Sequence, residues 1–230
     1  LSAAAGAMKT EKIKILSGVF VAFPRSPMAT AYDTWSLNEL SGGRFQLGIG
    51  SQIKALLTRR FGMDFQPPVR RMKDYIKAMQ AIWDCWQNET NLNFKGDFYT
   101  HSLMTPFFNP GPNPYGIPKI YVAAVGPLMT KSVAESADGL LVHPFHTPKY
   151  MHATTLPIVK EGLSSTGKDR AEFDFSISVM TATGLSEETY KKAIQACKNG
   201  IAFYASTPAY KGVLEAHGYG DLQGRLNLLS

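Results

Sequence analysis

Short apolar stretches alternate with stretches of helical periodicity along most of this chain, and this alternation limits the fold more than any other feature. Five stretches have the composition of strands buried in a parallel sheet: residues 13–23, 45–49, 119–124, 139–143 and 172–182. Helical patterns lie between them, over residues 28–40, 68–86, 128–137 and 148–163. Strands that alternate with helices form βαβ units with right-handed crossovers. The pattern therefore predicts an α/β fold on a parallel sheet, either a doubly wound open sheet or a barrel.

The remaining segments predict two more helices and a hairpin. Ser186, followed by two glutamates, is typical of a helix start, and that helix extends to about Tyr204. Another helix is predicted over residues 208–216. Residues 92–99 indicate a small hairpin, and a loop rich in Pro and Asn follows over residues 105–118.

Composition excludes several classes of protein. With 230 residues, 44% hydrophobic and 18% charged, the chain is globular, and we interpret residues 1–230 as a single domain. Its two cysteines, Cys85 and Cys197, exclude a disulfide framework and a multi-cysteine zinc module. No apolar run approaches the roughly 18 residues of a membrane span, and the first residues lack the apolar core of a secretory signal. We therefore expect a cytoplasmic protein without membrane contact.

The charge balance favours an anionic small molecule over nucleic acid. Lys and Arg number 24 against 18 Asp and Glu, a formal charge of +6. The basic residues are scattered, and the longest runs are doublets such as Arg59-Arg60 and Arg70-Arg71. Without a basic stripe or interleaved aromatic residues, nucleic-acid binding is not expected. Arg59-Arg60 either binds a phosphate or carboxylate or lies on a solvated helix face.

The turns that follow the predicted strands are the candidate site, because barrels of this kind place their active sites at the carboxyl ends of the strands. After the third of these strands, Val125-Gly126-Pro127 opens directly into a helix, whose free N–H groups and dipole favour a phosphate. Any tight strand-to-helix turn has this form, so a purely structural role stays open.

Gly48 and Gly50 also allow two interpretations. They line a candidate turn, or they permit close backbone packing or a positive φ. No third glycine follows at the spacing of a dinucleotide fingerprint, which disfavours a nucleotide-binding, doubly wound fold.

The histidines and serines give no catalytic assignment. His143 and His146 are separated by Pro144, which disfavours a helical two-histidine metal site, so we expect a pocket wall or loop and no metal. Isolated histidines, of which His101 is one, are expected to face solvent. No Gly-x-Ser-x-Gly elbow occurs.

An ordered series of motifs resembles the bacterial-luciferase-like superfamily over nearly the whole chain. The series runs Leu-Ser-Gly-Gly-Arg-Phe-Gln-Leu-Gly-Ile-Gly-Ser (40–51), Arg-Phe-Gly (60–62), and then segments within residues 71–83, 94–99 and 118–140. Ser51-Gln52, Arg59-Arg60-Phe-Gly and Phe-Tyr-Ala-Ser-Thr-Pro-Ala-Tyr (203–210) resemble the branch that uses the deazaflavin coenzyme F420 rather than FMN.

The resemblance implies an eight-stranded (β/α)8 TIM barrel of the luciferase-like type, of which this chain would hold about five strands and be truncated at both ends. It also implies hydride transfer, or oxygen activation, on a deazaflavin or flavin. Gly50, Ser51 and Gln52 would line the ring or its side chain, and a cis peptide at Gly18–Val19 would buttress the ring. The cofactor phosphate would be surrounded by Ala124, Val125, Gly126, Pro127, Met129 and Thr130.

Departures from the family pattern narrow these expectations. The loop in which relatives often carry a catalytic histidine or acid is absent, so the catalytic residue is unknown. Ile53 replaces a Glu of some F420 relatives, which argues against sugar-phosphate dehydrogenation. Ser51 replaces the phosphate-binding Arg of flavin-using luciferases, which favours deazaflavin.

We therefore expect an F420-dependent oxidoreductase that acts on an unidentified small organic substrate. An FMN-dependent monooxygenase and a non-catalytic barrel relative are the alternatives. Members of the family are commonly dimers, which leaves a homodimer open.

Overall fold

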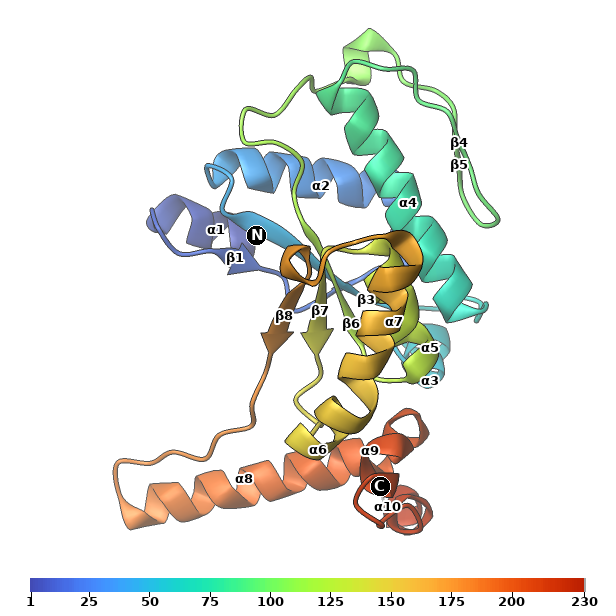
Figure 1. Cartoon of the computed structure of the whole chain (residues 1–230). Coiled ribbons are helices and arrows are strands. Elements are labelled where there is room, and N and C mark those ends of the chain that lie inside the picture. Colours follow the sequence, from blue (N-terminus) through green and yellow to red (C-terminus); the bar gives the residue numbers. More distant parts are fainter. Residues whose placement is uncertain (230) are drawn as a thin grey trace.

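A curled parallel sheet forms the centre of the computed structural model, which describes residues 1–229 (Figure 1). The strand order is β1-β3-β6-β7-β8, and β2 also pairs with β3, all in parallel. The strands are β1 (Ile15–Leu16), β2 (Phe20–Val21), β3 (Phe45–Gly50), β6 (Ile120–Ala124), β7 (Gly139–Val142) and β8 (Asp174–Ile177). β1 and β2 are two parts of one predicted strand, so the five predicted strands are confirmed as the sheet.

The first strand is not continuous as predicted. It is interrupted between β1 and β2, where the Gly18–Val19 peptide bond is cis, as the resemblance implied. There the Ser17 hydroxyl replaces the backbone ladder: it donates to the Gly48 carbonyl oxygen and accepts from the Gly48 N–H, both at 2.9 Å.

The glycines of β3 are required by this close approach. A Cβ on Gly48 would lie 1.9 Å from the Ser17 carbonyl oxygen, and one on Gly50 would lie 2.9 Å from Cγ2 of Val19. Of the two interpretations of these glycines, close backbone packing is therefore confirmed.

Helices between the strands cover one face of the sheet (Figure 1): α2 (Pro27–Leu40), α4 (Pro68–Gln87), α5 (Pro127–Ser136) and α7 (Leu156–Thr166). The predicted helix over 148–163 starts with α6 (Pro148–Tyr150) and a π-helical turn, η2 (Met151–Thr155), before α7. Trp83 and Trp86 of α4 are fully buried, and Trp86 packs edge-on against Trp35 of α2 at 5.4 Å. The apolar stripe predicted for α4 is thus the centre of the core.

The Ser-Gly-Gly-Arg-Phe motif has a structural role. Gly42 and Gly43 have φ of 64° and 79°, which end α2. The Arg44 guanidinium donates to the carbonyl oxygens of Ala7, Thr10 and Ile13, and so holds the end of α1 (Ser2–Lys9) against the start of β3. The motif fixes the entry to the strand that leads into the candidate site.

The predicted hairpin pairs two residues further along than expected, as β4 (Phe94–Lys95) and β5 (Thr100–His101). The Asp74 carboxylate accepts the N–H groups of Phe98 and Tyr99 and so fastens the hairpin to α4. His101 is half-buried there rather than solvent-facing, so that expectation was wrong; burial lowers its pKa. The loop that follows contains the short helix η1 (Pro106–Phe108).

At the amino ends of the strands, a tyrosine spans three neighbouring strands. Tyr121, Gly139 and Asp174 are register partners on β6, β7 and β8. The Tyr121 ring lies across Gly139, where a Cβ would be 2.6 Å from it, and its hydroxyl donates to the Asp174 carboxylate at 2.6 Å. This hydrogen bond, followed by the one from Lys119, lowers the pKa of Asp174.

We expect the Tyr121–Asp174 bond to make stability depend on acidity. A carboxyl group with a lowered pKa in the folded state stabilises the fold above its unfolded pKa of about 3.9, and this stabilisation is lost as the pH falls through the folded value. Tyr121→Phe should cost about 1 kcal/mol at pH 7 and less at pH 3. Urea unfolding at both pH values tests this; an equal cost at both would contradict it.

Beyond Ile177 the chain leaves the sheet, earlier than the predicted strand end at residue 182. Ile177 pairs with Val142, the last residue of β7, so no ladder partner follows. The chain then forms α8 (Glu187–Ser206), η4 (Pro208–Tyr210), α9 (Lys211–Glu215) and α10 (Leu222–Leu229). We call residues 187–229 the arm; it lies beyond the carboxyl ends of β7 and β8 (Figure 1).

Among residues 1–229, three α-helices had no sequence-based prediction from periodicity: α1, α10 and the six-residue α3 (Lys54–Arg59). Across residues 1–229, none of the helices combines the length and apolar character needed to cross a membrane.

Candidate functional site

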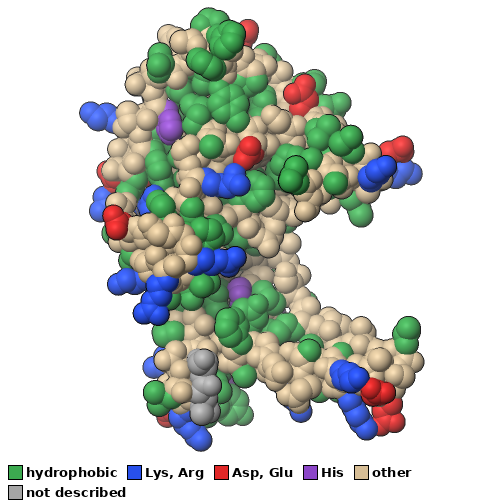
Figure 2. Space-filling view, turned by 180° about the vertical axis from the view of Figure 1, so that it is seen from behind, with side chains coloured by type: hydrophobic (Ala, Val, Ile, Leu, Met, Phe, Trp, Pro, Cys, Tyr) green, Lys and Arg blue, Asp and Glu red, His purple; other side chains and the backbone are tan. Residues whose placement is uncertain are grey.

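The carboxyl ends of β2, β3, β6 and β7 share one edge of the sheet, and the arm faces that edge. Figure 2 shows the molecule hollowed between its main body and the arm, with hydrophobic side chains at the base of the hollow. Because parallel strands present their carboxyl ends together, the turns that follow them meet in this region.

The turn after β3 holds three predicted site residues: Gly50, Ser51 and Gln52. Gly50 is buried, and its Cβ position is 3.7 Å from Cβ of Ala123 on β6. Gln52 has φ of 62°, a left-handed conformation that costs a non-glycine residue on the order of 1 kcal/mol and that clusters at functional sites. The turn therefore has a fixed and unusual backbone directly beside the end of β6.

The turn after β6 is an uncapped helix start. Gly126 is the N-cap of α5, and no side chain accepts from the first turn. Pro127 has no N–H, so the donors that helix geometry leaves without an intrahelical partner are those of Gly126, Leu128 and Met129. Nothing lies within 4 Å of the Cβ position of Gly126, so there is free space beside the N-cap residue. We call these three N–H groups the cradle.

The structure brings most of the predicted residues to this edge, whereas Gly18 lies before the start of β2, and their exposure differs. Val19 contacts the Gly50 position, and Gly50 in turn neighbours the end of β6. The Thr130 side chain is buried and its hydroxyl donates back to the Gly126 carbonyl oxygen at 3.0 Å, while Met129 packs against the core. Gly18 and Pro127 are exposed, Ala124 is buried, and Ser51, Val125 and Gly126 are half-buried.

Sequence reasoning missed an aromatic cluster beside the cradle. His143, at the end of β7, lies 4.6 Å from the ring centres of both Tyr204 and Tyr210 on the arm. Phe145 and Tyr150 are buried in the same cluster with Ala205 and Val213 of the arm. Tyr204 and Tyr210 both belong to the motif at residues 203–210, and both contact His143, the residue that follows β7.

A small pocket lies at this cluster and reaches Val125, the residue before the cradle. Its walls come from the ends of β6 and β7 and from α6 and η2: Ala124, Val125, Leu140, Val142, His143, Phe145, His146, Tyr150 and Thr155. His143 and His146 therefore line a pocket from the segment after β7, where the sequence predicted either a pocket wall or a loop. Within residues 1–229, no three His, Cys, Asp or Glu side chains lie close enough together to hold a metal ion.

The His143 ring is held in one tautomer. Its Nδ1 accepts the Phe145 N–H at 3.1 Å, which leaves the proton of the neutral ring on Nε2. Burial, and then the charge of His146, lowers the pKa of His143. The ring is therefore neutral near pH 7.

Acidification should weaken the docking of the arm. A histidine with a lowered folded pKa stabilises the fold above its unfolded value of about 6.5, and this contribution is lost as the pH falls below that value. We expect the melting temperature to fall between pH 7.5 and 5.5, and to fall less in His143→Phe. A His143→Phe variant with the wild-type pH dependence would contradict this.

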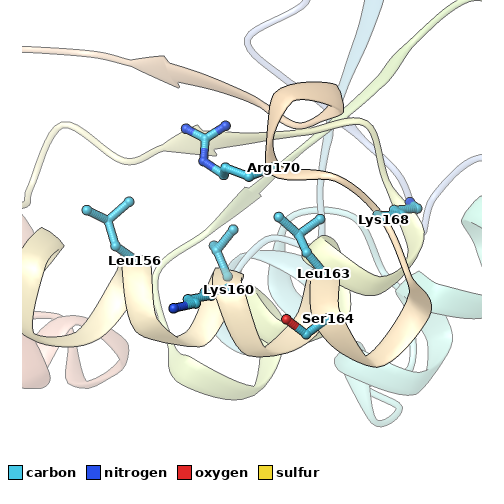
Figure 3. Close-up of a pocket in the computed structure, with 7 residues that line it drawn as sticks. Leu156, Lys160, Leu163, Ser164, Lys168 and Arg170 are labelled. Atoms are coloured by element: carbon cyan, nitrogen blue, oxygen red, sulfur yellow. The ribbon is translucent and has the colours of Figure 1, made fainter.

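A larger pocket of about 400 Å³ lies elsewhere, between α7 and the turn before β8 (Figure 3). Leu156 and Leu163 of α7 point toward Arg170, whose guanidinium lies 4.6 Å from the Phe175 ring centre. Lys168 donates to the Ala137 carbonyl oxygen at 3.0 Å. This pocket faces the outer, helical side of the sheet, so it is separate from the candidate site.

Comparison with known proteins shows which family this chain resembles. The sequence profile of a family described as luciferase-like monooxygenase matches residues 1–227. An uncharacterized protein of Mycobacterium tuberculosis is 44% identical over 96% of this chain and 65% of its own length. The 5,10-methylenetetrahydromethanopterin reductase of Archaeoglobus fulgidus is 31% identical over 94% of this chain and 60% of its own length.

A solved structure, the coenzyme F420-dependent tetrahydromethanopterin reductase from Methanopyrus kandleri, superimposes with a TM-score of 0.73. The two sequences are 25% identical, and the superposition covers 94% of this chain and 62% of the Methanopyrus kandleri chain. The chain thus spans about two thirds or less of the length of these relatives. The parallel sheet corresponds to part of the luciferase-like barrel. Of the two predicted architectures, the doubly wound open sheet and the barrel, the barrel is therefore confirmed.

Proposed function

We propose that this chain, which belongs to the luciferase-like monooxygenase family, binds coenzyme F420 and serves hydride transfer between that cofactor and a small organic substrate. The observation that carries the proposal is the uncapped start of α5 after β6, the strand that pairs with β3, where β3 itself is followed by the left-handed turn at Gln52. Because the chain spans part of its relatives, the activity proposed is that of the whole protein.

The cradle fits the phosphate of such a cofactor. Backbone N–H groups and the positive end of the helix dipole stabilise an anion at a helix start. No side chain caps this turn, so no side-chain acceptor competes with a phosphate for its N–H groups, and the Cβ position of Gly126 is open. Gly126, Leu128 and Met129 would hold the phosphate through their N–H groups.

The redox ring would lie along the sheet edge toward β3. Val19 packs on the glycine position at Gly50, and Ser51 and Gln52 follow it, so these residues form a surface against which a planar ring can lie. When bound, the deazaflavin supplies the hydride chemistry. The protein orients the ring and, with the arm across the edge, excludes water.

Two observations favour F420 over FMN. The Methanopyrus kandleri enzyme, at 25% identity and TM-score 0.73, depends on F420. In addition, Ser51 stands where flavin-using luciferases are expected to carry a phosphate-binding Arg. The family description, luciferase-like monooxygenase, supports the FMN-dependent alternative.

A titration separates these alternatives. The protein is titrated with F420 and with FMN, and binding is followed by the change in cofactor fluorescence. We expect F420 to bind in the micromolar range or tighter and FMN to bind more weakly. Binding of FMN alone would establish the monooxygenase alternative, and binding of neither would favour a non-catalytic relative.

A further inference from the structure

Tyr150 contacts both the residue before the cradle and the arm. No sequence motif predicted either contact. Its side chain is buried, with its ring among Phe145, Ala205 and Val213. Its hydroxyl donates to the Val125 carbonyl oxygen at 3.2 Å. The Cβ position of Gly212, on α9 of the arm, lies 3.5 Å from the same hydroxyl oxygen.

The bond to Val125 determines where the first cradle donor points. In a planar trans peptide, the C=O and the following N–H point in opposite directions. Since the Val125 carbonyl faces Tyr150, the Gly126 N–H faces away from it. The Tyr150 hydroxyl is thus a side-chain donor to this peptide, and no side chain beyond the chain neighbours lies within 4 Å of the Gly126 Cβ position.

The hydroxyl is well suited to act as a fixed donor. Burial, followed by the charge of Glu215, raises the pKa of Tyr150, so the proton stays on the oxygen throughout the physiological range. The start of α6 is also fixed, because the Thr147 hydroxyl accepts the Tyr150 N–H at 3.2 Å. The Thr147 hydroxyl also bonds Nε2 of His217 on the arm at 2.8 Å.

We infer that Tyr150 is a positioning residue that holds the Val125–Gly126 peptide so that the Gly126 N–H is presented to the anionic group, and that the docked arm holds Tyr150 in place. This inference rests on the proposed function, because it assumes that the cradle receives a phosphate. Cofactor affinity and docking of the arm are then thermodynamically coupled, and each favours the other.

The first test is the removal of one hydroxyl. Tyr150→Phe keeps the ring in its apolar cluster and removes only the bond to Val125. We expect the affinity for F420 and FMN to fall about five- to tenfold, the effect of one hydrogen bond. Binding of riboflavin, which has no phosphate, should not change. The matched control is Tyr121→Phe, which loses a tyrosine hydrogen bond at the opposite end of the sheet and should bind both cofactors as the wild type does.

The second test measures the coupling itself. Amide hydrogen exchange in α9 is compared with and without bound cofactor. We expect the cofactor to slow exchange in α9 of the wild type, and to slow it less in Tyr150→Phe at equal saturation.

Each result is decisive. Selective loss for the phosphate-bearing ligands, with reduced protection of α9, supports the inference. Unchanged affinity in Tyr150→Phe, or an equal loss for riboflavin, would overturn it while leaving the proposed function intact. A wild type that binds neither cofactor would overturn both.

Discussion

Gly48→Ala is expected to destabilise the protein by at least about 3 kcal/mol. The new Cβ would lie 1.9 Å from the Ser17 carbonyl oxygen, a backbone atom, and 2.9 Å from Cδ1 of Leu141. Relief requires that β1 move away from β3, which breaks both hydrogen bonds between Ser17 and Gly48. At roughly 2–4 °C per kcal/mol for a chain of this size, the melting temperature should fall by about 10 °C.

Gly224→Ala is the matched control for this substitution. Gly224 lies within α10, and nothing lies within 4 Å of its Cβ position. Alanine favours helix over glycine by up to about 1 kcal/mol, so the control should not lose stability. A difference of 2–3 °C in melting temperature corresponds to roughly 1 kcal/mol in the free energy of unfolding. If Gly48→Ala melts within that range of the control, the close approach of the two strands is contradicted.

Gly126→Asp should abolish cofactor binding and leave the fold intact. The φ of −72° suits any residue, and the Cβ position is open. As an N-cap, the new carboxylate would accept the free N–H groups of the first turn and stabilise α5 by a few tenths of a kcal/mol. A cofactor phosphate would then lose these donors and meet a like charge. We expect a loss of about 2–3 kcal/mol, about 100-fold in affinity.

Gly126→Ala provides the control, because it adds a methyl group without an acceptor or a charge. It should bind F420 within about threefold of the wild type, less than the worth of one hydrogen bond. Fluorescence titration measures both affinities, and thermal melting checks the fold. If the Asp variant binds F420 as tightly as the Ala variant does, the phosphate does not bind at the start of α5.

The sequence predicted the strands and the connecting helices well, because buried strands and amphipathic helices have distinct periodicities. The stripe from Met72 to Trp83 predicted α4, and the structure buries it. The break in the first strand could not be predicted from periodicity, since residues on both sides of it are apolar. The break depends on the hydrogen bond between the Ser17 side chain and Gly48, which is distant in the sequence.

The candidate site divides in the same way. The cradle could be predicted because it is local: a strand, a glycine and a proline that begins a helix. The aromatic cluster could not be predicted, because its members are distant in the sequence. β8 and most of α8 lie between His143 and Tyr150 on one side and Tyr204 and Tyr210 on the other. His101 was misplaced for a similar reason: its burial comes from the hairpin, whose position depends on the distant Asp74.

The measurement that tests the central claim most directly is an amide ¹H–¹⁵N correlation spectrum of the protein during titration with F420. If the start of α5 holds the cofactor's phosphate, the amide signals of Gly126, Leu128 and Met129 shift most strongly, in step with saturation, and those of Ser51 and Gln52 shift with them. Saturable binding that leaves these signals in place would contradict the account.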